Sequence, residues 1–496
     1  MKHSKTLCLS LAVAMILAVS AACANQITSD DSNSGTSSEG NSSAQTTVAV
    51  DPLEEMRPVY PANLDFGEYE FKILTRGDEA HAMPLHTRDL FAEAITADPI
   101  NDAVYRRNLE VEDKFNIKIK AIVLPEGNEN APNEALKKSV LAEEDEYDLL
   151  MTHAGNGATT ASAGYLLSWN TIPYIDPSKP WWCEGAVKGL AVGDKLFLSL
   201  SDLSVSSNHY AYMVYFNKSV HREFNVVDLY DLVRSGKWTF DKIAEVTKGI
   251  TQDISGDGVM DEKDRYGAIV SYGALNFLYA GGNTIMSKDE KNYPFLNVFT
   301  ERAISTFEKA YDICHADYTM FAPGWQNFME MNAMFASDKV LLYMTNLERI
   351  DALREMDSDF GVLPYPKLDE NQDKYYTYVD SHSPLMGIPR TASDTERTGA
   401  IVEELSYLSR KYLVPAYYDV TLKTKFARDD ESSEMFDYIF DGRVYDFGYV
   451  YDLTTTFIFQ NQINDKKREY MSALEKRMTT AEKLLEKIIA AYDDVA

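Results

Sequence analysis

Strand and helix patterns alternate along this chain, and the alternation limits its fold more than any other feature of the sequence. Glu68 to Leu74 alternates apolar and polar residues as a half-buried strand does, and residues 102–115 carry apolar side chains at helical spacing. Residues 116–123 again have a strand pattern, and a helical stretch at 133–142 precedes a short buried strand at 147–151. This order predicts an α/β fold with a mainly parallel sheet.

The same alternation returns in the middle of the chain. It predicts helices over 239–251 and 300–316, and strands over 266–271 and 339–344. No long linker separates the two regions, so we expect two lobes between which the chain crosses back and forth.

The predicted lobes are each built from two segments. Lobe 1 comprises residues 66–205 and 345–411, and lobe 2 comprises residues 206–344 and 412–496. Lobe 2 ends in a helix over 466–492, whose apolar stripe we expect to pack on the body of the protein.

The first residues have the pattern of an export signal. Lys2 and Lys5 precede an apolar stretch that, at about 1.5 Å per residue, is too short to span a hydrocarbon core of about 30 Å. The stretch ends in Ala21-Ala22-Cys23, and small residues before a cysteine resemble the lipobox of bacterial lipoproteins, although Ser20 stands where leucine is usual. We therefore expect residues 1–22 to be a lipoprotein signal peptide and Cys23 to be lipidated. The alternative is a plain secretory cleavage site.

The segment after Cys23 fits a tether. Residues 24–50 are rich in Ser, Thr, Asn and Gly and show no apolar periodicity, so they cannot bury enough surface to fold. We expect residues 23–65 to be the lipidated cysteine and a flexible linker. The protein would then lie at the extracellular face of the cytoplasmic membrane, held there by its lipid anchor only.

The charge of the chain excludes some partners. It has 77 acidic and 48 basic residues, a formal net charge of -29. Such a surface repels phosphate backbones and anionic lipid headgroups, so we expect no binding to nucleic acid.

Only two cysteines, Cys183 and Cys314, remain in the predicted folded body. A disulfide bond between them and two free thiols are both compatible with their spacing.

One loop has the pattern of a calcium site. Residues 253–264 place oxygen-bearing side chains at positions 1, 3, 5, 9 and 12 of an EF-hand-like loop, with Gly258 at the sharp turn of position 6. The predicted ligands of a structural Ca²⁺ are Asp253, Ser255, Asp257, the carbonyl of Val259, Asp261 and Asp264. Position 12 is Asp rather than Glu, which favours a modest affinity. The alternative is an Asp- and Gly-rich surface turn without a metal.

The order of several motifs is similar to that of a known family. The signal and lipobox are followed by Pro99 to Phe115 (PINDAVYRRNLEVEDKF), Tyr147-Asp148-Leu149-Leu150, Tyr215-Phe216-Asn217-Lys218, Gly236 to Asp241 (GKWTFD) and Phe360 to Lys367 (FGVLPYPK). In this order they resemble extracellular solute-binding proteins of family 1, the carbohydrate-type binding lipoproteins of ABC importers. The resemblance implies a two-lobe periplasmic-binding-protein-like fold (type II), with crossover hinge strands and a ligand cleft between the lobes. It also implies permease subunits as partners and a protein that is not an enzyme.

Ligands of open α/β sheets bind outside the carboxyl ends of the strands. Those ends place near the cleft Thr75 and Arg76, residues 152–156, 206–210, 272–276, 345–346 and 380–383. Carboxylates, amides and guanidinium groups can bind sugar hydroxyls, and aromatic rings can pack on sugar faces. The predicted ligand contacts are Arg76, Asn156, Trp182, His209, Asn276, Trp325, Asn346 and Asp380, with Trp182 and Trp325 as stacking platforms. Each of them is also compatible with an ordinary structural role.

We expect a monomer that closes on a neutral oligosaccharide by hinge motion near 206–215, 344–347 and 413–416. A competing interpretation is a secreted calcium-containing glycoside hydrolase, which needs two carboxylates about 5–10 Å apart. The chain contains no HExxH, GxSxG or P-loop motif that would indicate another enzyme class.

Overall fold

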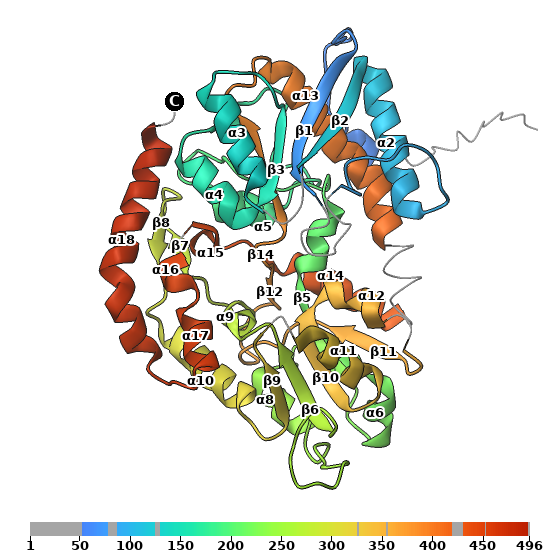
Figure 1. Cartoon of the computed structure of the whole chain (residues 1–496), viewed down its shortest axis with the longest axis vertical. Helices are drawn as coiled ribbons and strands as arrows, with labels where there is room; N and C mark the ends of the chain where they lie inside the picture. Colours follow the sequence, from blue (N-terminus) through green and yellow to red (C-terminus); the bar gives the residue numbers. More distant parts are fainter. Residues whose placement is uncertain are drawn as a thin grey trace, which may run out of the picture. The chain divides into compact units, whose positions relative to one another are not determined.

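The computed structural model describes residues 52–77, 87–124, 129–324, 327–353, 356–418, 430–451 and 453–494. Contacts between residues separate the chain at residue 51, and the second unit, residues 52–496, contains all of the described residues. The predicted signal peptide (1–22), Cys23 and Trp325 lie outside the described residues. Two five-stranded sheets with flanking helices form a mixed α/β fold in the second unit (Figure 1).

The first sheet has the strand order β2-β1-β3-β13-β4. β1 (Tyr69–Arg76) pairs in parallel with β2 (Ile117–Leu124) and β3 (Leu149–His153). β13 (Pro384–Pro389) is antiparallel to β3 and to β4 (Leu166–Leu167). The helices that follow the three parallel strands are α2 (Pro99–Phe115), α3 (Ala131–Leu141) and α4 (Ala154–Ser162), and Figure 1 shows α3 and α4 beside β3. The predicted strands and helices of this region are confirmed.

Capping residues define both ends of α2. The side chain of Asp98 accepts hydrogen bonds from the backbone N–H groups of Ile100 and Asn101, and Pro99 occupies the first turn, where no donor is needed. At the other end Asn116 adopts a left-handed φ of 51° and terminates the helix just before β2. The predicted apolar face is buried: Ile100, Val104, Val111 and Phe115.

The second sheet has the strand order β11-β5-β10-β6-β9. β6 (Tyr266–Ser271) is parallel to β10 (Val340–Asn346) and β9 (Thr319–Ala322). β5 (Tyr212–Asn217) is antiparallel to β10 and to β11 (Phe360–Leu363). Its helices include α9 (Leu275–Ala280), α10 (Glu301–Cys314) and α11 (Phe328–Ala336).

α8 (Phe240–Val246) is shorter than the helix predicted over 239–251. The hydroxyl of Thr247 donates to the carbonyl of Ile243 at 2.7 Å, and Gly249 has a left-handed φ of 78°. The glycine turns the chain out of the helix before the acidic loop.

The described residues cross between the two sheets on neighbouring segments. A 3-10 helix at Val205–Tyr210 leads into β5, so the chain crosses between the sheets here, and hinge motion near 206–215 stays a prediction. The return runs from β11 through β12 (Thr377–Tyr378) to β13. The N–H of Asp380 donates to the carbonyl of Tyr210 at 3.0 Å, so the outgoing and returning segments lie side by side.

The return crossing differs from the prediction, which placed it at 344–347 and assigned residues 345–363 to lobe 1. β10 continues to Asn346, and β11 pairs with β5 in the second sheet. A partner strand far away in the sequence decides this assignment, so no local pattern reveals it. The third predicted hinge, at 413–416, follows a π-helix at Ser409–Leu413, and residues 419–429 lie outside the described part of the chain.

The C-terminal region is helical. α18 (Tyr470–Asp494) buries Leu474, Ala481, Leu485 and Ile488 of the predicted stripe and contacts α4 and α10, so the expectation that it packs on the body is confirmed. Among the described residues, no helix is long and apolar enough to cross a membrane. The remaining elements are α1 (Pro52–Glu55), α5 (Glu184–Leu190), α6 (Lys218–Glu223), α7 (Leu229–Arg234), α12 (Ile350–Leu353), α13 (Thr395–Leu408), α14 (Asp430–Asp441), α15 (Phe447–Tyr451), α16 (Leu453–Thr456), α17 (Ile458–Asn464), β7 (Met286–Lys288), β8 (Pro294–Leu296) and β14 (Arg443–Val444).

The folded body begins earlier than predicted, because residues 52–65 are packed and are not a flexible linker. The guanidinium of Arg57 lies 3.1 Å from the carboxylate of Glu404, which is fully buried, and 3.3 Å from that of Glu110. The ring of Tyr60 packs edge-on against Phe115, with 5.3 Å between the ring centroids. Apolar side chains recur in this segment every few residues and pack on the core: Leu53, Met56, Tyr60 and Leu64.

Cys183 and Cys314 are both free thiols. Cys314 is buried in α10, and burial raises the pKa of its thiol. The structure thus has two free cysteines rather than the disulfide that the sequence left open.

Candidate functional site

Polar side chains at the ends of the first sheet meet on the returning segment. Arg76 ends β1 and His153 ends β3, while Asp380 and His382 precede β13. The guanidinium of Arg76 donates to the backbone carbonyl of His382 at 2.5 Å, and the two imidazole rings lie 5.2 Å apart. Together with Glu129, which precedes α3, these residues are named the strand-end cluster.

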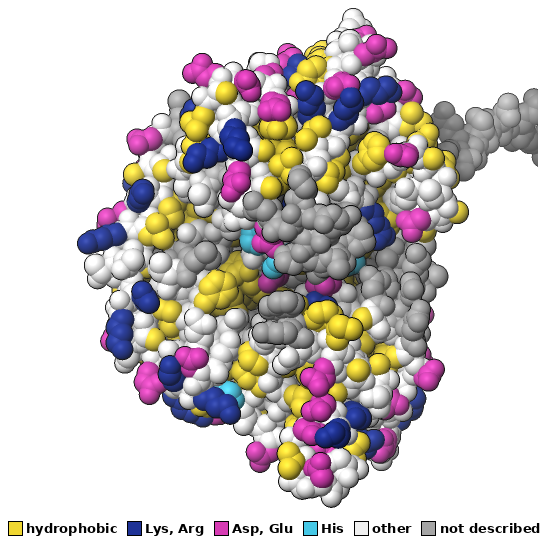
Figure 2. Space-filling view, viewed as in Figure 1, with side chains coloured by type: hydrophobic (Ala, Val, Ile, Leu, Met, Phe, Trp, Pro, Cys, Tyr) yellow, Lys and Arg dark blue, Asp and Glu magenta, His cyan; other side chains and the backbone are white. Residues whose placement is uncertain are grey.

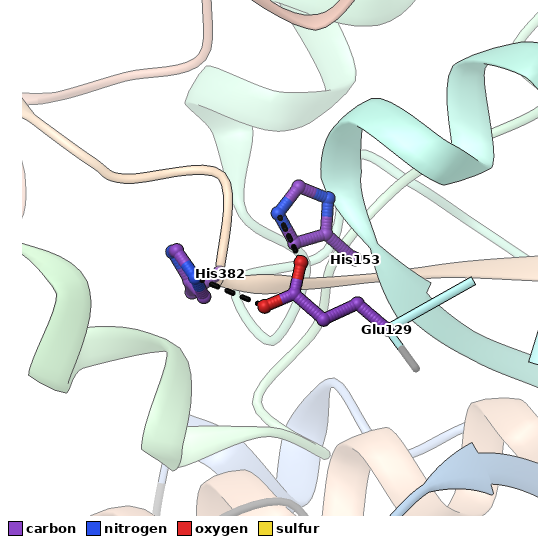
Figure 3. Close-up of side chains that lie close together, drawn as sticks. All are labelled: Glu129, His153 and His382. Carbon is purple, nitrogen blue, oxygen red and sulfur yellow. Dashed lines mark ion pairs between the residues drawn. The ribbon is translucent and has the colours of Figure 1, made fainter. Parts of the chain in front are cut away.

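Two carboxylates hold the imidazole of His382. Glu129 Oε1 lies 3.2 Å from His382 Nε2, and Glu129 Oε2 lies 3.6 Å from His153 Nε2. Figure 3 shows the Glu129 carboxylate between the two rings. On the other side Asp380 Oδ1 contacts His382 Nδ1 and accepts the backbone N–H of His382 at 2.9 Å. In Figure 2, histidine and acidic side chains are visible together near the middle of the face shown.

The two histidines differ in charge. Burial lowers the pKa of His153 to about 4, and the nearby Arg76 acts in the same direction. Burial also disfavours the charged form of His382, but hydrogen bonds to Asp380 and Glu129 outweigh it and raise the pKa to about 10. At neutral pH the cluster therefore has one neutral and one protonated imidazole.

Polar groups at the end of β10 continue the site on the second sheet. The amide of Asn346 donates to Glu348 at 3.3 Å, and Glu348 lies 3.0 Å from the guanidinium of Arg349. Burial raises the pKa of Glu348, and the negative charge of Asp380 adds to the rise. Asp380 therefore links the strand ends of the two sheets electrostatically.

Tyr272 is an aromatic residue at the end of β6 that the predicted contacts do not include. It has a φ of 64°, a conformation that costs a non-glycine residue about 1–2 kcal/mol and is often retained at functional sites. Its hydroxyl accepts a hydrogen bond from Arg349 at 2.9 Å, and its ring stays partly exposed. The structure thus holds a partly exposed ring beside a charged group, which suits contact with a sugar face.

Three predicted ligand contacts are instead core residues, and these assignments need correction. Trp182 is 4% exposed and donates its indole N–H to Glu403 at 3.0 Å. Asn276 is 2% exposed and donates to the hydroxyl of Tyr365 at 3.1 Å. His209 is 4% exposed, and burial lowers its pKa to about 3. Tertiary packing encloses these side chains, so none of them faces a solute in this conformation.

The other predicted contacts have different outcomes. Arg76 and Asp380 belong to the strand-end cluster, and Asn346 lies at the end of β10. Arg76 and Asn346 are 5% and 4% exposed, so they are as enclosed as the three residues above, whereas Asp380 is partly exposed. Asn156 lies in the first turn of α4, after His153, and its role stays a prediction. Trp325 is outside the described residues, so its role also stays a prediction.

Several cluster residues were only partly anticipated. The predicted strand ends 152–156, 272–276 and 380–383 contain His153, Tyr272 and His382, although the predicted ligand contacts do not include these three residues. Glu129 was missed, because a single glutamate before a helix carries no distinguishing pattern. Only the packing of α3 on β3 brings it to the histidines.

The predicted calcium loop lies between α8 and β6. Gly258 has a φ of 80°, as expected at the sharp turn. Asp253 accepts the hydroxyl of Ser255 at 3.2 Å, and Asp264 accepts the backbone N–H of Ser255 at 2.9 Å, so positions 1, 3 and 12 are close together. Asp261 instead forms an ion pair with Lys263 at 2.9 Å. The oxygen donors fit a hard cation such as Ca²⁺. For Asp261 to become a ligand, its ion pair with Lys263 must break.

No family model matches the chain, and the search of curated proteins gave no match. Solved structures do resemble it. The sugar-binding protein MalE from Xanthomonas citri has a TM-score of 0.57 at 12% identity, over 86% of this chain and 99% of its own. A cyclo/maltodextrin-binding protein complexed with maltotetraose has a TM-score of 0.54 at 14% identity (87% and 98% coverage). RafE from Streptococcus pneumoniae has a TM-score of 0.51 at 15% identity (86% and 98% coverage). The chain therefore has the two-lobe, periplasmic-binding-protein-like α/β fold.

Proposed function

We propose that the protein is the substrate-binding lipoprotein of an ABC importer, which captures an extracellular oligosaccharide and delivers it to membrane permeases. One observation carries the proposal: polar groups from the strand ends of both sheets converge on the segment that connects the sheets. Asp380 and Tyr272 are partly exposed and offer acceptors for hydroxyl groups and a ring. Arg76 and Arg349, in contrast, are 5% and 6% exposed, and their guanidinium groups bond to His382 and Tyr272. The likeness in fold to proteins whose names include sugar and maltodextrin binding supports the choice of ligand.

A hinge between the sheets would let the protein exchange between an open and a closed form. Ligand binding shifts such an equilibrium only by contacts that one form makes and the other lacks. Residues on both sheets beside the crossing segments can supply this difference. The chain is expected to act as a monomer.

Calorimetry against a glycan panel tests the ligand class. We expect saturable binding of a neutral oligosaccharide and weaker binding of acidic sugars, because the chain carries a net charge of -29. Amino acids and short peptides serve as comparison ligands. Binding of a peptide and of no sugar would remove the carbohydrate part of the proposal and leave solute capture.

The glycoside hydrolase interpretation makes a different prediction. A hydrolase would release reducing sugar from an oligosaccharide that it binds, whereas a transport protein should return the bound glycan unchanged. Incubation of the protein with its tightest-binding glycan, followed by a reducing-sugar assay, separates the two functions.

We also propose that Cys23 anchors the protein at the extracellular face of the cytoplasmic membrane. Two acyl chains hold a protein stably at a bilayer, whereas one chain gives only marginal binding. We expect radiolabelled palmitate to be incorporated into the wild type and not into Cys23→Ser. Cys8→Ser, which alters the predicted signal peptide but not the lipobox, is the matched control and should keep the label. Labelled Cys23→Ser protein would contradict the anchor.

Calcium is proposed to stabilise the loop at 253–264. At a free concentration ten times the dissociation constant, a ligand of the native state adds about 1.4 kcal/mol of stability, which raises the melting temperature by about 2 °C in a chain of this size. We expect chelation by EDTA to lower the melting temperature and excess Ca²⁺ to restore it. Asp253→Asn should abolish the response, and Glu290→Gln, an exposed acid outside the loop, should retain it. An identical melting temperature with EDTA and with Ca²⁺ argues against the site.

A further inference from the structure

Three metal-ligating side chains converge in the strand-end cluster. One ligand atom from each of Glu129, His153 and His382 lies within 4.8 Å of the other two (Figure 3). The carboxylate of Glu129 is 3.2 Å from His382 Nε2 and 3.6 Å from His153 Nε2. Zinc bonds of about 2.0–2.1 Å place neighbouring ligands of a tetrahedral ion about 3.3 Å apart, so these separations already approach those of a metal site.

His153 ends β3, and Glu129 and His382 lie in turns directly before α3 and β13. His153 pairs directly with Pro384 in the register between β3 and β13, which fixes the position of His382 two residues earlier. Asn133 in α3 donates to the hydroxyl of Thr152 at 2.6 Å, and this bond ties the start of α3 to the end of β3. Glu129 precedes that helix and is thereby placed opposite His153. The helix and the two strands next to these residues thus limit how far the ligands can move apart.

Asp380 holds the imidazole of His382 from the side opposite Glu129. Its carboxylate contacts His382 Nδ1, so the Nε2 atom of the same ring is the one that faces Glu129. A carboxylate on the far nitrogen of a histidine is the usual partner of a metal-binding imidazole, because it fixes the ring and increases its basicity.

The donor set selects the class of metal. Two imidazole nitrogens and one carboxylate oxygen suit zinc and similar divalent transition metals, whereas Ca²⁺ and Mg²⁺ prefer oxygen ligands alone. We propose that Glu129, His153 and His382 bind a divalent transition-metal ion of the zinc class. Three protein ligands leave a fourth tetrahedral position for water or for an oxygen of a bound molecule. This site shares Asp380 with the proposed sugar site and no residue with the calcium loop, and metal binding can be measured without any sugar.

The local charge is compatible with a cation. Glu129, Asp380 and Glu348 are acidic, while Arg76 and Arg349 are basic, and Glu348 pairs with Arg349 at 3.0 Å. The guanidinium of Arg76 is turned to the carbonyl of His382. A bound ion would have to displace the proton on His382 Nε2 that faces Glu129, so a hydrogen-bonded ion pair without metal is the competing arrangement.

The test is calorimetric titration of the chelator-treated full chain with ZnCl₂, in excess Ca²⁺ so that the loop at 253–264 does not contribute. Co²⁺ replaces Zn²⁺ in a parallel absorption experiment, because tetrahedral Co²⁺ with nitrogen ligands has an intense visible band. We expect one equivalent of Zn²⁺ to bind. His153→Ala, His382→Ala and Glu129→Gln should each weaken it at least ten-fold and remove the Co²⁺ band. Asp380→Asn should weaken it about ten-fold, as outer-shell changes do.

His221→Ala and His315→Ala are matched controls, since these rings contact backbone carbonyls in other parts of the fold. Both should bind Zn²⁺ like the wild type. Glu129→Gln keeps the size of a partly exposed side chain, so it remains informative if a histidine variant fails to fold. Absence of stoichiometric Zn²⁺ binding to the wild type overturns the proposal in favour of the ion pair. Unchanged binding in folded Glu129→Gln and His382→Ala overturns it as well.

Discussion

Tyr272→Ala is expected to weaken solute binding by roughly ten- to a hundred-fold, because burying an aromatic ring on a ligand is worth about 1.5–3 kcal/mol. The ring is partly exposed, and its hydroxyl is held by Arg349 at 2.9 Å. A φ of 64° costs alanine about as much conformational energy as it costs tyrosine, so the backbone strain changes little. The loss of affinity therefore measures the contribution of the ring. Isothermal titration with the best glycan of the panel gives the affinity.

Two further variants make the Tyr272 result specific. Tyr272→Phe keeps the ring and loses only the hydrogen bond, so most of the affinity should remain. Phe295→Ala removes a ring that is 45% exposed on β8 and should not alter binding. A folded Tyr272→Ala protein that binds the glycan as tightly as the wild type would refute the platform.

Trp182→Ala is expected to lower the free energy of unfolding by about 3–5 kcal/mol, the usual cost of deleting a buried aromatic side chain. Its indole is 4% exposed, packs edge-on against Trp169 at 5.2 Å and donates to Glu403 at 3.0 Å. Burial raises the pKa of Glu403 to about 7, and the two indole donors, Trp181 and Trp182, oppose that rise. The variant therefore loses ring packing and one of two hydrogen bonds to a buried carboxyl group.

Urea unfolding followed by circular dichroism measures the effect of Trp182→Ala. Trp182→Phe, which keeps a ring but no donor, should lose less stability, and Phe295→Ala should lose less than about 1 kcal/mol. Solute affinity of the folded fraction should not change. A stable Trp182→Ala protein with weakened sugar binding would instead restore the stacking role predicted from the sequence.

Local patterns were sufficient to predict most of the individual strands and helices. The strand predicted over 266–271 coincides with β6, and the apolar face of α2 is buried as expected. These features depend on spacing between near neighbours, which the sequence displays directly. Lobe boundaries depend on which strands pair, and the membership of β11 follows from its bonds to β5 rather than from its own residues.

The candidate site was predicted by region and only partly by residue. The carboxyl end of β1 can be found from its pattern, so Arg76 was placed near the crossing. Asp380 instead precedes β13, and the antiparallel pairing of β13 with β3 brings it to the same edge of the sheet. Whether a tryptophan is a platform or a core residue depends on what packs over it, and Trp182 meets a glutamate more than two hundred residues later. The approach of Glu129 to His153 and His382 requires the register of β3 with β13 and the packing of α3.

The packing of residues 52–65 changes how far a lipid-anchored molecule could reach. A coil over 24–65 would have 42 residues and a root-mean-square reach of roughly 36 Å, whereas 24–51 has 28 residues and reaches roughly 29 Å, at about 5.5 Å × √n. The linker would also be attached at a defined position, since Arg57 joins residues 52–65 to Glu404 of α13 and Glu110 of α2. The lobe that contains the first sheet would then be attached to the membrane. During hinge closure the lobe that contains the second sheet would be the one that moves relative to the membrane.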